Sequence, residues 1–537
     1  MRRSARTLIV YVAACAVVGF IFISSPHGHG FTASLENARR LAGAAASNAG
    51  GGGSVSDVRS QALSFLTAVQ NPDPSYKKEN FPQHWDYTGK QGFNGGYMWY
   101  TETKLRELTA CAVRNDCHPN AYKVVIFSGW YCHETFFRNF GAGEGTWCKS
   151  MKNSLDRQGY TVLLARDNPA TASATTNRTN ATPEYAYHIY RQIPDLVVGI
   201  IGDTHNGHGN IDRWFKSPER PDGIPAWKFF HFGFFGLRDT TVVGNKWIVS
   251  ALPNWHKEKG EEAAWTWLGY DLPLIDAKEV VPFEERPHRV WILAKDLSYF
   301  YDLNDLLSWP LDFFERATQE LRQKWPDFEF VGSFNDRRFI IQEHQKDQTK
   351  PKLKPREQPK GIVALGGGVG GEEGTLLSPA EFRRELSNSR VMLGIGRPTV
   401  SPSPYEAMML GVPFINPYWP GPHDPNGTDH SSTWHWTQHT SLHFEKPPHV
   451  YNALRNSYES FIETITAAME TPCPPKRMEW VSEEAQDKRM REFMEFDWRS
   501  LAAGILEERL KGNETQLGKG PWLNGRHIPE KPGLFEL

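Results

Sequence analysis

The segment from Val391 to Pro417 holds the residues whose types and spacing best fit a chemical task. It reads V-M-L-G-I-G-R-P-T-V-S-P-S-P-Y-E-A-M-M-L-G-V-P-F-I-N-P. The apolar run Val391–Ile395 predicts a buried strand, and Gly394 and Gly396 predict a tight loop after it. A short helix follows the loop. This order predicts a place for a diphosphate at the carboxyl end of a parallel strand, against free N–H groups and a helix N-terminus.

Three residues predict where that helix begins. Ser403 stands at the N-cap position, Pro404 at the first helical position, and Glu406 three residues after the serine, which completes a capping box. Gly411 is expected to end the helix, and Val412–Ile415 to form the next strand. Glu406 would lie within reach of the ribose hydroxyls of a nucleotide. A capping box without any ligand is the competing interpretation.

The segment closely resembles the donor-binding signature of glycosyltransferase family 18, whose members build the β1,6 branch of N-glycans. The family pattern is a strand ending in G-x-G, a proline-rich loop, P-x-E-A, a glycine and a strand ending in Asn-Pro. The matching residues are Gly394, Gly396, Pro398, Pro404, Glu406, Ala407, Gly411, Asn416 and Pro417. Two more stretches are similar to family elements: Trp291–Phe300, and Gly374–Ser387, where Ser378 and Glu381 predict another capping box.

Strand-like and helix-like patterns alternate along most of the chain. This alternation predicts an α/β protein with parallel sheets covered by helices on both faces. The resemblance implies a GT-B-like arrangement, in which two Rossmann-like domains face a cleft. Expected strands are Lys123–Phe127, Tyr160–Ala165, Leu196–Ile201, Arg289–Leu293, Phe328–Val331 and Gly361–Leu365, and expected helices are Thr146–Gln158, Leu311–Lys324 and Pro379–Asn388.

The chain divides into segments by composition and pattern. Residues 26–56 are rich in Gly, Ala and Ser, which predicts a flexible stem. Residues 57–285 and residues 286–510 are expected to form one Rossmann-like domain each, which the family resemblance implies are the acceptor-side and the nucleotide-sugar domain. Helical sequence at 482–510 is expected to cross back to the first domain, and residues 511–537 form a tail.

The N-terminus predicts a membrane anchor. Arg2, Arg3 and Arg6 precede an uncharged apolar run at Leu8–Ile23. As a helix this run spans about 24 Å, which suits a thin membrane of the early secretory pathway. Residues 1–25 are therefore expected to be a signal anchor with a cytosolic basic end and a lumenal remainder; a cleavable signal peptide is the alternative. The family resemblance implies a type II Golgi membrane protein.

Overall composition fits a large enzyme. The chain has 537 residues, of which 39% are hydrophobic and 13% aromatic, enough for two cores. Its formal net charge of -2 gives no general attraction for nucleic acid. Possible N-glycosylation acceptors stand at Asn177, Asn180, Asn426 and Asn513.

Five cysteines lie beyond the anchor. An oxidising lumen would favour disulfides, and close spacing suggests that Cys111 pairs with Cys117 and Cys132 with Cys148. Cys473 would then stay a thiol. Spacing alone leaves other connectivities open. A zinc site is the rival interpretation, although no CxxC or paired His/Cys spacing supports it.

Sugar transfer to a hydroxyl group needs a base, and Glu144 is the best candidate. It stands in the glycine-rich segment Gly141–Trp147, before a predicted helix, so it is expected to face the cleft. The matching family loop, G-G-P-x-G-E, carries the glutamate taken to be the catalytic base. A helix N-terminal charge favoured by the dipole is the alternative interpretation of Glu144, and Glu134 is the fallback base.

The leaving diphosphate also needs stabilisation. No D-x-D motif for a divalent metal occurs in the chain, so the sequence predicts metal-independent catalysis without a cofactor. Arg397 or Lys295, with the helix N-termini at Ser378 and Ser403, would carry the charge. The expected donor-binding residues are Lys295, Ser378, Gly394, Gly396, Arg397, Pro398, Ser403 and Glu406.

Other features have simpler interpretations beside the functional ones. Gly366–Gly371 lacks a P-loop continuation and is expected to be a flexible loop. Asp203, His205 and His208 could bind a metal but fit a loop after a strand. Trp434–Trp436 could stack on a sugar or be buried.

The family resemblance implies inverting transfer of N-acetylglucosamine from UDP-GlcNAc to the 6-hydroxyl of an α1,6-mannose on N-glycans. This reaction would make the chain a hexosyltransferase whose partners are a nucleotide sugar, an N-glycan acceptor and a membrane. Val400 departs from the family, which carries an acidic residue there. Another nucleotide sugar or acceptor, or a silent glycan-binding protein, therefore stays open, as does the oligomeric state.

Overall fold

The structure is a computed structural model. It describes residues 95–138, 142–165, 184–202, 215–217, 220–234, 241–253, 265–301, 309–335, 357–368, 377–419, 436–511 and 535–537. Several predictions fall outside them: the anchor, the stem, Asn177, Asn180, Asn426, Asn513, Asp203, His205, His208, Trp434 and His435. Within these ranges, no helix has the length and apolar character that crossing a membrane requires.

The first half of the chain forms a parallel sheet with the strand order β2-β1-β3-β4-β5-β6. Residues 124–127 of the central strand β1 are at most 1% exposed, because helices cover both faces of the sheet. The strands are β1 (Val124–Ser128), β2 (Thr161–Leu164), β3 (Val197–Gly202), β4 (Phe229–Phe232), β5 (Ile248–Ser250) and β6 (Thr266–Trp267), and the helices are α4 (Gly95–Arg114), α5 (Trp130–Arg138), α6 (Gly143–Arg157) and α7 (Glu184–Gln192).

The second half forms a sheet with the order β12-β11-β10-β7-β8-β9, in which β13 also pairs with β11. Its described pairings are parallel except that of β12 with β11. The strands are β7 (Arg289–Leu293), β8 (Glu329–Asn335), β9 (Ile362–Gly368), β10 (Val391–Gly394), β11 (Phe414–Trp419), β12 (Trp436–Thr437) and β13 (Val450–Leu454), and the helices are α8 (Ser298–Tyr301), α9 (Asp312–Leu321), α11 (Pro379–Ser387), α12 (Ser403–Met409) and α13 (Tyr458–Glu470). Two parallel-sheet α/β domains, as predicted, are therefore confirmed.

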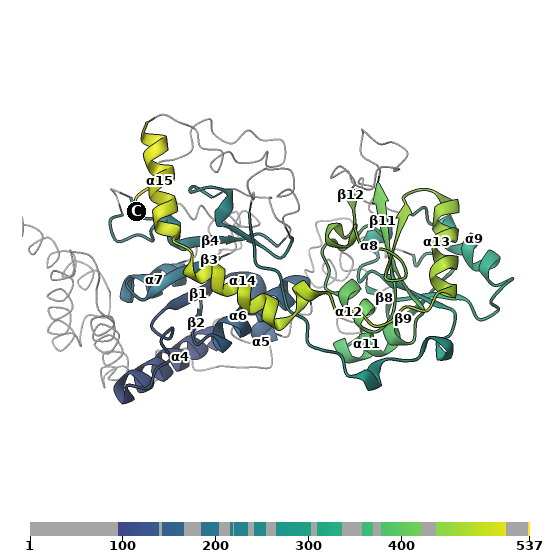
Figure 1. Cartoon of the computed structure of the whole chain (residues 1–537), viewed down its shortest axis with the longest axis horizontal. Helices are drawn as coiled ribbons and strands as arrows, with labels where there is room; N and C mark the ends of the chain where they lie inside the picture. The colour runs from purple at the N-terminus through teal and green to yellow at the C-terminus, as the bar shows by residue number, and fades with distance from the viewer. Residues whose placement is uncertain are drawn as a thin grey trace, which may run out of the picture.

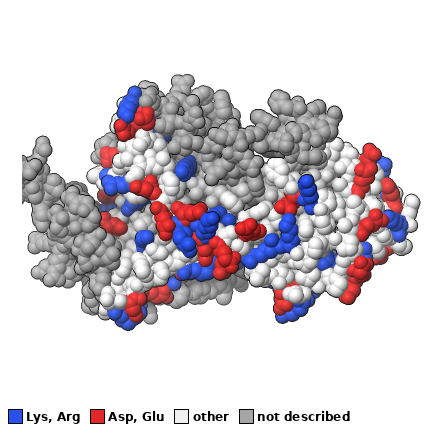
Figure 2. All heavy atoms as spheres, viewed as in Figure 1, with Lys and Arg blue, Asp and Glu red and all other residues white. Residues whose placement is uncertain are grey.

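The last two helices, α14 (Glu483–Glu495) and α15 (Trp498–Leu510), follow the second sheet in sequence but pack on the first domain (Figure 1). On α6, Arg157 Nη2 lies 2.6 Å from Asp487 Oδ1 of α14. Farther along, the Trp498 ring meets the rings of Phe230 and Trp247 edge to face. Figure 2 shows charged side chains of both signs gathered along α14. One buried cluster therefore includes side chains from the first sheet, α12, α14 and α15.

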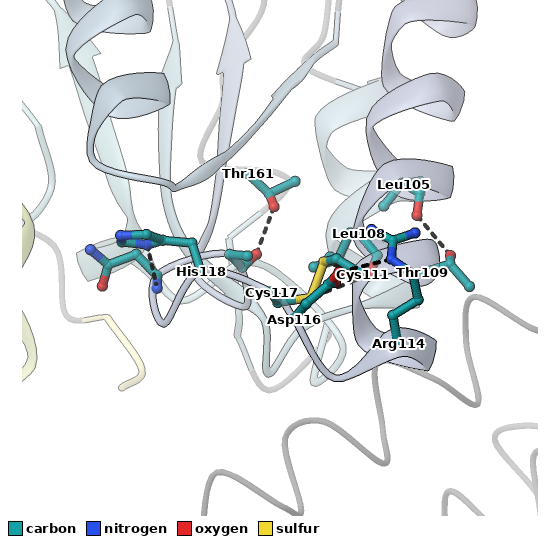
Figure 3. The surroundings of a disulfide bond; sticks show 11 residues. Leu105, Leu108, Thr109, Cys111, Arg114, Asp116, Cys117, His118 and Thr161 are labelled. Carbon is teal, nitrogen blue, oxygen red and sulfur yellow. Dashed lines mark hydrogen bonds and ion pairs between the residues drawn. A yellow bond between two sulfur atoms is a disulfide. The ribbon is translucent and has the colours of Figure 1, made fainter.

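Both suggested disulfides are confirmed. Cys111–Cys117 joins the end of α4 to the loop after it (Figure 3), and Cys132–Cys148 joins α5 to α6. In the small loop that the first disulfide closes, Arg114 Nε lies 2.8 Å from Asp116 Oδ2. Cys473 is a buried thiol.

Some local predictions about loops are wrong. No helix was expected between the strand at 123–127 and the helix at 146–158, but α5 lies there; Cys132 on α5 is buried and forms the disulfide with Cys148 on α6. The helix α6 starts at Gly143, so Glu144 lies in its first turn rather than in a turn before it. Gly366–Gly368 continue the strand β9 and are not a loop, because their backbone pairs with β8.

Candidate functional site

The second sheet reverses its winding between β7 and β10. From β7 the chain moves outward to β8 and β9, and then returns to β10 on the other side of β7. Such a reversal opens a crevice at the carboxyl ends of the two strands, where ligands of open α/β sheets bind. Leu293 pairs with Gly394 at these ends. Lys295 and Arg397 therefore leave the sheet from neighbouring strands at one edge.

The loop between β10 and α12, residues 395–402, has an unusual backbone. Gly396 has a φ of 88° and Val400 a φ of 57°. A β-branched residue rarely adopts this left-handed conformation, which costs about 1–2 kcal/mol for an L-residue. The Val400 side chain is nevertheless buried, with 5% exposure. Contacts around the β10–α12 loop must therefore hold its conformation.

Three side chains from other parts of the second domain hold this loop and the end of β10 before it. Trp309 Nε1 donates to the Gly394 carbonyl at 2.7 Å, where β10 ends. Gln438 Oε1 accepts from the Gly396 N–H at 2.8 Å, and its Nε2 donates to the Pro398 carbonyl at 3.0 Å. His439 Nε2 donates to the Ser401 carbonyl at 2.6 Å.

The capping box predicted at Ser403 and Glu406 does not form. Pro402 is the N-cap residue of α12, and the Ser403 N–H donates to Ser401 Oγ at 3.3 Å. Because the Gly396 and Ser403 amides bond within the protein, neither supplies a free N–H to a diphosphate. The binding of a diphosphate at the β10–α12 loop stays a prediction.

The Glu406 side chain is half-buried at the side of α12. Burial raises the pKa of its carboxyl to about 6; the nearby Arg383 on α11 opposes this rise and Glu279 adds to it. Glu406 thus lies close to α11 and to the segment that precedes β7.

Ser378 is the exposed N-cap residue of α11, and the predicted capping box with Glu381 is confirmed. Ser378 N–H donates to Glu381 Oε2 at 2.8 Å, and Glu381 N–H donates to Ser378 Oγ at 3.3 Å. The preceding Leu377 N–H donates to Ser333 Oγ on β8 at 3.4 Å. The start of α11 therefore lies beside β8, the strand next to β7.

Glu144 approaches this edge from the first domain. It lies in the first turn of α6, and Gly143 beside it meets the β10–α12 loop: a Cβ atom built on Gly143 would lie 3.2 Å from Pro402 Cδ and 2.9 Å from Phe234 Cζ. A side chain at position 143 would require Phe234 or Pro402 to shift. The α6 N-terminus and the β10–α12 loop are therefore in contact across the two domains.

The fallback base, Glu134, has a different environment. Its Oε1 lies 3.2 Å from His133 Nδ1, and both residues are 5% exposed. Glu144 is half-buried instead. Access to an acceptor hydroxyl is therefore easier at Glu144.

The structure brings most predicted site residues to one region. Glu144 comes from the first domain, and Lys295, Gly394, Gly396, Arg397, Pro398 and Ser403 come from the β7 and β10 ends of the second. Ser378 and Glu406 lie at the flank formed by α11 and α12. Sequence reasoning missed Trp309, Gln438 and His439, because nothing in their local sequence indicates that they hold a loop distant in the chain.

Among the residues described, no group of three or more His, Cys, Asp or Glu side chains is arranged to hold a metal ion.

No protein-family model and no curated protein sequence matches the chain. Searches of solved structures return S. aureus MnaA with UDP, at 9% identity over 77% of this chain and 100% of that one, with a TM-score of 0.33. The Methanocaldococcus jannaschii UDP-GlcNAc 2-epimerase with UDP-GlcNAc and UDP has 11% identity over 69% and 99%, with a TM-score of 0.33. The spinosyn rhamnosyltransferase SpnG has 10% identity over 73% and 100%, with a TM-score of 0.28.

Proposed function

We propose that the protein is an inverting glycosyltransferase that moves N-acetylglucosamine from UDP-GlcNAc to the 6-hydroxyl of an α1,6-mannose on N-glycans. It works without a metal ion, and its two α/β domains act as in the GT-B arrangement. The protein is anchored in the Golgi membrane as a type II protein with these domains in the lumen. The donor-loop residues and the lack of a D-x-D motif support this proposal.

The contact between Gly143 and Pro402 is the observation that carries the proposal. It joins two segments that the sequence marks independently: one with a candidate base, the other with a candidate donor loop. A transferase needs a base and a leaving-group site on opposite sides of the reacting sugar carbon. Each domain supplies one of them here.

The proposed reaction is a single displacement. Glu144 accepts the proton of the acceptor hydroxyl while the hydroxyl oxygen bonds to C1 of the donor sugar. The bond between C1 and the diphosphate oxygen breaks with its electron pair, and UDP leaves. The cations of Arg397 and Lys295 stabilise the growing charge on the diphosphate. Attack from the face opposite the leaving group inverts the configuration at C1.

UDP release by residues 57–537 tests the proposal. The assay contains EDTA, a biantennary N-glycan and a panel of UDP and GDP sugars. We expect acceptor-dependent release from UDP-GlcNAc. Replacing Glu144 with Gln should lower the rate by about 10²- to 10⁴-fold, because it removes a general base and keeps the shape.

Glu134→Gln is the matched control, since it makes the same change on α5. We expect Glu134→Gln to lower the free energy of unfolding, because Glu134 is buried. We expect it to leave the rate of UDP release close to that of the unchanged protein. Release from a different donor would redirect the proposal to that sugar. Intact UDP binding with no release from any donor would favour the silent glycan-binding protein instead.

A further inference from the structure

A buried chain of hydrogen bonds runs beneath the β10–α12 loop. Tyr405 Oη lies 2.5 Å from Ser441 Oγ, which lies 3.1 Å from His439 Nδ1, and His439 Nε2 lies 2.6 Å from the Ser401 carbonyl oxygen. The three side chains and Ser401 are at most 8% exposed. These hydrogen bonds therefore join the end of the loop to the helix α12 that follows it.

The partners determine the direction of these bonds. A carbonyl oxygen can only accept, so His439 carries its proton on Nε2 and donates to Ser401. His439 Nδ1 then accepts from the Ser441 hydroxyl, whose oxygen accepts from Tyr405. Burial lowers the pKa of His439 to about 4, which keeps the ring neutral at physiological pH. Only one tautomer satisfies the whole chain.

The backbone of His439 is held as well. Its N–H donates to Asn416 Oδ1 at 3.0 Å, and Asn416 Nδ2 donates to Asn452 Oδ1 at 3.2 Å. The Gln438 N–H donates to the Pro417 carbonyl at 3.1 Å. Residues 438 and 439 are thereby attached to β11 and β13, and their side chains reach the loop from a rigid base.

Together these two side chains hold the β10–α12 loop on both sides of its strained residue. Gln438 binds the backbone at Gly396 and Pro398, and His439 binds it at Ser401. Val400 lies between these attachments with its φ of 57°. A left-handed valine persists only where its surroundings enforce the conformation.

We infer that Gln438 and His439 are positioning residues for the donor diphosphate, acting through the β10–α12 loop that presents Arg397. Neither residue needs to touch the ligand. The inference rests on the proposed function for the role of the loop in donor binding. Preorganisation of this kind improves affinity, because the strained loop conformation is formed before the ligand arrives.

Two amide substitutions at His439 test whether this residue holds the β10–α12 loop through its hydrogen bond to Ser401 or only fills space in the core. The amide nitrogen of Gln can reach the place of His Nε2, so His439→Gln keeps the donor to Ser401. The shorter Asn reaches only the place of Nδ1, so His439→Asn loses it. Both variants bury a neutral amide of the same chemistry.

Hydrogen exchange of the peptide 394–403 is the first measurement, and the Kd for UDP is the second. We expect faster exchange and about tenfold weaker UDP binding in His439→Asn, and near-normal values in His439→Gln. Ser441→Ala, which removes little volume, should also speed exchange because it frees Nδ1. Thr161→Val, which removes a buried hydroxyl bond to Ala121 far from the loop, should leave exchange unchanged.

Equal exchange in the Gln and Asn variants would overturn the positioning role, as would a normal Ser441→Ala. If His439→Asn fails to fold, the exchange rates of Ser441→Ala and His439→Gln decide whether His439 holds the loop. A natural chain that binds no UDP would overturn the proposed function. The exchange data would then still decide whether residues 438 and 439 hold the loop.

Discussion

At the scale of single residues, the candidate site contains two residues whose conformation or burial costs folding free energy. Val400 adopts a left-handed conformation, and Glu406 holds a carboxyl where burial disfavours its charge. Residues of this kind persist where surrounding structure outweighs their cost, and they concentrate at functional sites. Both lie on the segment that the sequence marks for donor binding.

Glu406 makes the stability of the protein depend on pH. Its folded pKa of about 6 exceeds the ordinary 4.5, so the folded state binds more protons between these values. Stability from this group therefore falls as pH rises from about 4.5 to 6, by about 2 kcal/mol in all. Urea unfolding should show Glu406→Gln gaining stability over the natural chain above pH 6, but not near pH 4.5.

A gain independent of pH would contradict the shifted pKa of Glu406. The same variant also tests its predicted contact with the ribose. If Glu406 binds ribose hydroxyls, Glu406→Gln should weaken UDP binding above pH 6 while it stabilises the protein. Glu279→Gln is the comparison variant, because it removes a charge that raises the pKa of Glu406 but keeps the Glu406 carboxyl itself.

At the scale of elements, α6 has two tasks. Its first turn presents Glu144 to the second domain, and its last turn carries Ser154 and Arg157, which bond to Asp487 of α14. The Cys132–Cys148 disulfide fixes it to α5. The position of the candidate base therefore depends on what holds this helix.

Removing the Cys132–Cys148 disulfide tests this dependence. Changing both residues to Ala should lower the free energy of unfolding by about 3 kcal/mol, from the entropy of the 16-residue loop. Alanine is chosen because both positions are buried. We also expect UDP release to fall more than UDP binding, because α6 loosens while the second domain is unchanged.

The matching change at Cys111 and Cys117 is the control. Its six-residue loop should contribute only about 2 kcal/mol, and it lies at the end of α4, away from the loop that contacts Gly143. Equal effects of the two double variants on turnover would contradict a specific role for α5 and α6. Thermal unfolding and the release assay measure both quantities.

At the scale of the whole molecule, the two domains are joined by packed helices as well as by the chain segment that connects them. Arg286, just before β7, is 3% exposed and donates to the carbonyls of Leu410 and Gly411 at the end of α12. A cation at this position suits the negative end of a helix. Arg286 thereby connects the segment before β7 to the end of α12 within the second domain, while the returning helices α14 and α15 pack on the first domain.

Trp498 tests whether the returning helices couple the domains. Its ring packs against Phe230 and Trp247 in the first domain, so Trp498→Ala should cost about 3–5 kcal/mol. We expect calorimetry to show the first domain melting separately and earlier. Phe461→Ala, in the core of the second domain, is the control and should lower the other transition. A single shifted transition in both variants would instead show that the domains melt together.

The sequence by itself determined the elements and their class, because hydrophobic periodicity and glycine positions act over short distances. The strand at Arg289–Leu293 has the predicted bounds, and the capping box at Ser378 formed because all its atoms lie within four residues. The capping box at Ser403 did not form because the nearby Ser401 hydroxyl accepts from the Ser403 N–H, in a loop that the distant residues Gln438 and His439 hold.

Only the tertiary structure decided which segments meet. The packing of Gly143 on Pro402, the anchoring of the β10–α12 loop by residues 438 and 439, and the docking of α14 on α6 join parts far apart in sequence. No local pattern encodes such contacts, since they depend on the winding order of two sheets. The sequence therefore identified candidate groups for the chemistry, and the fold decided which of them can act together.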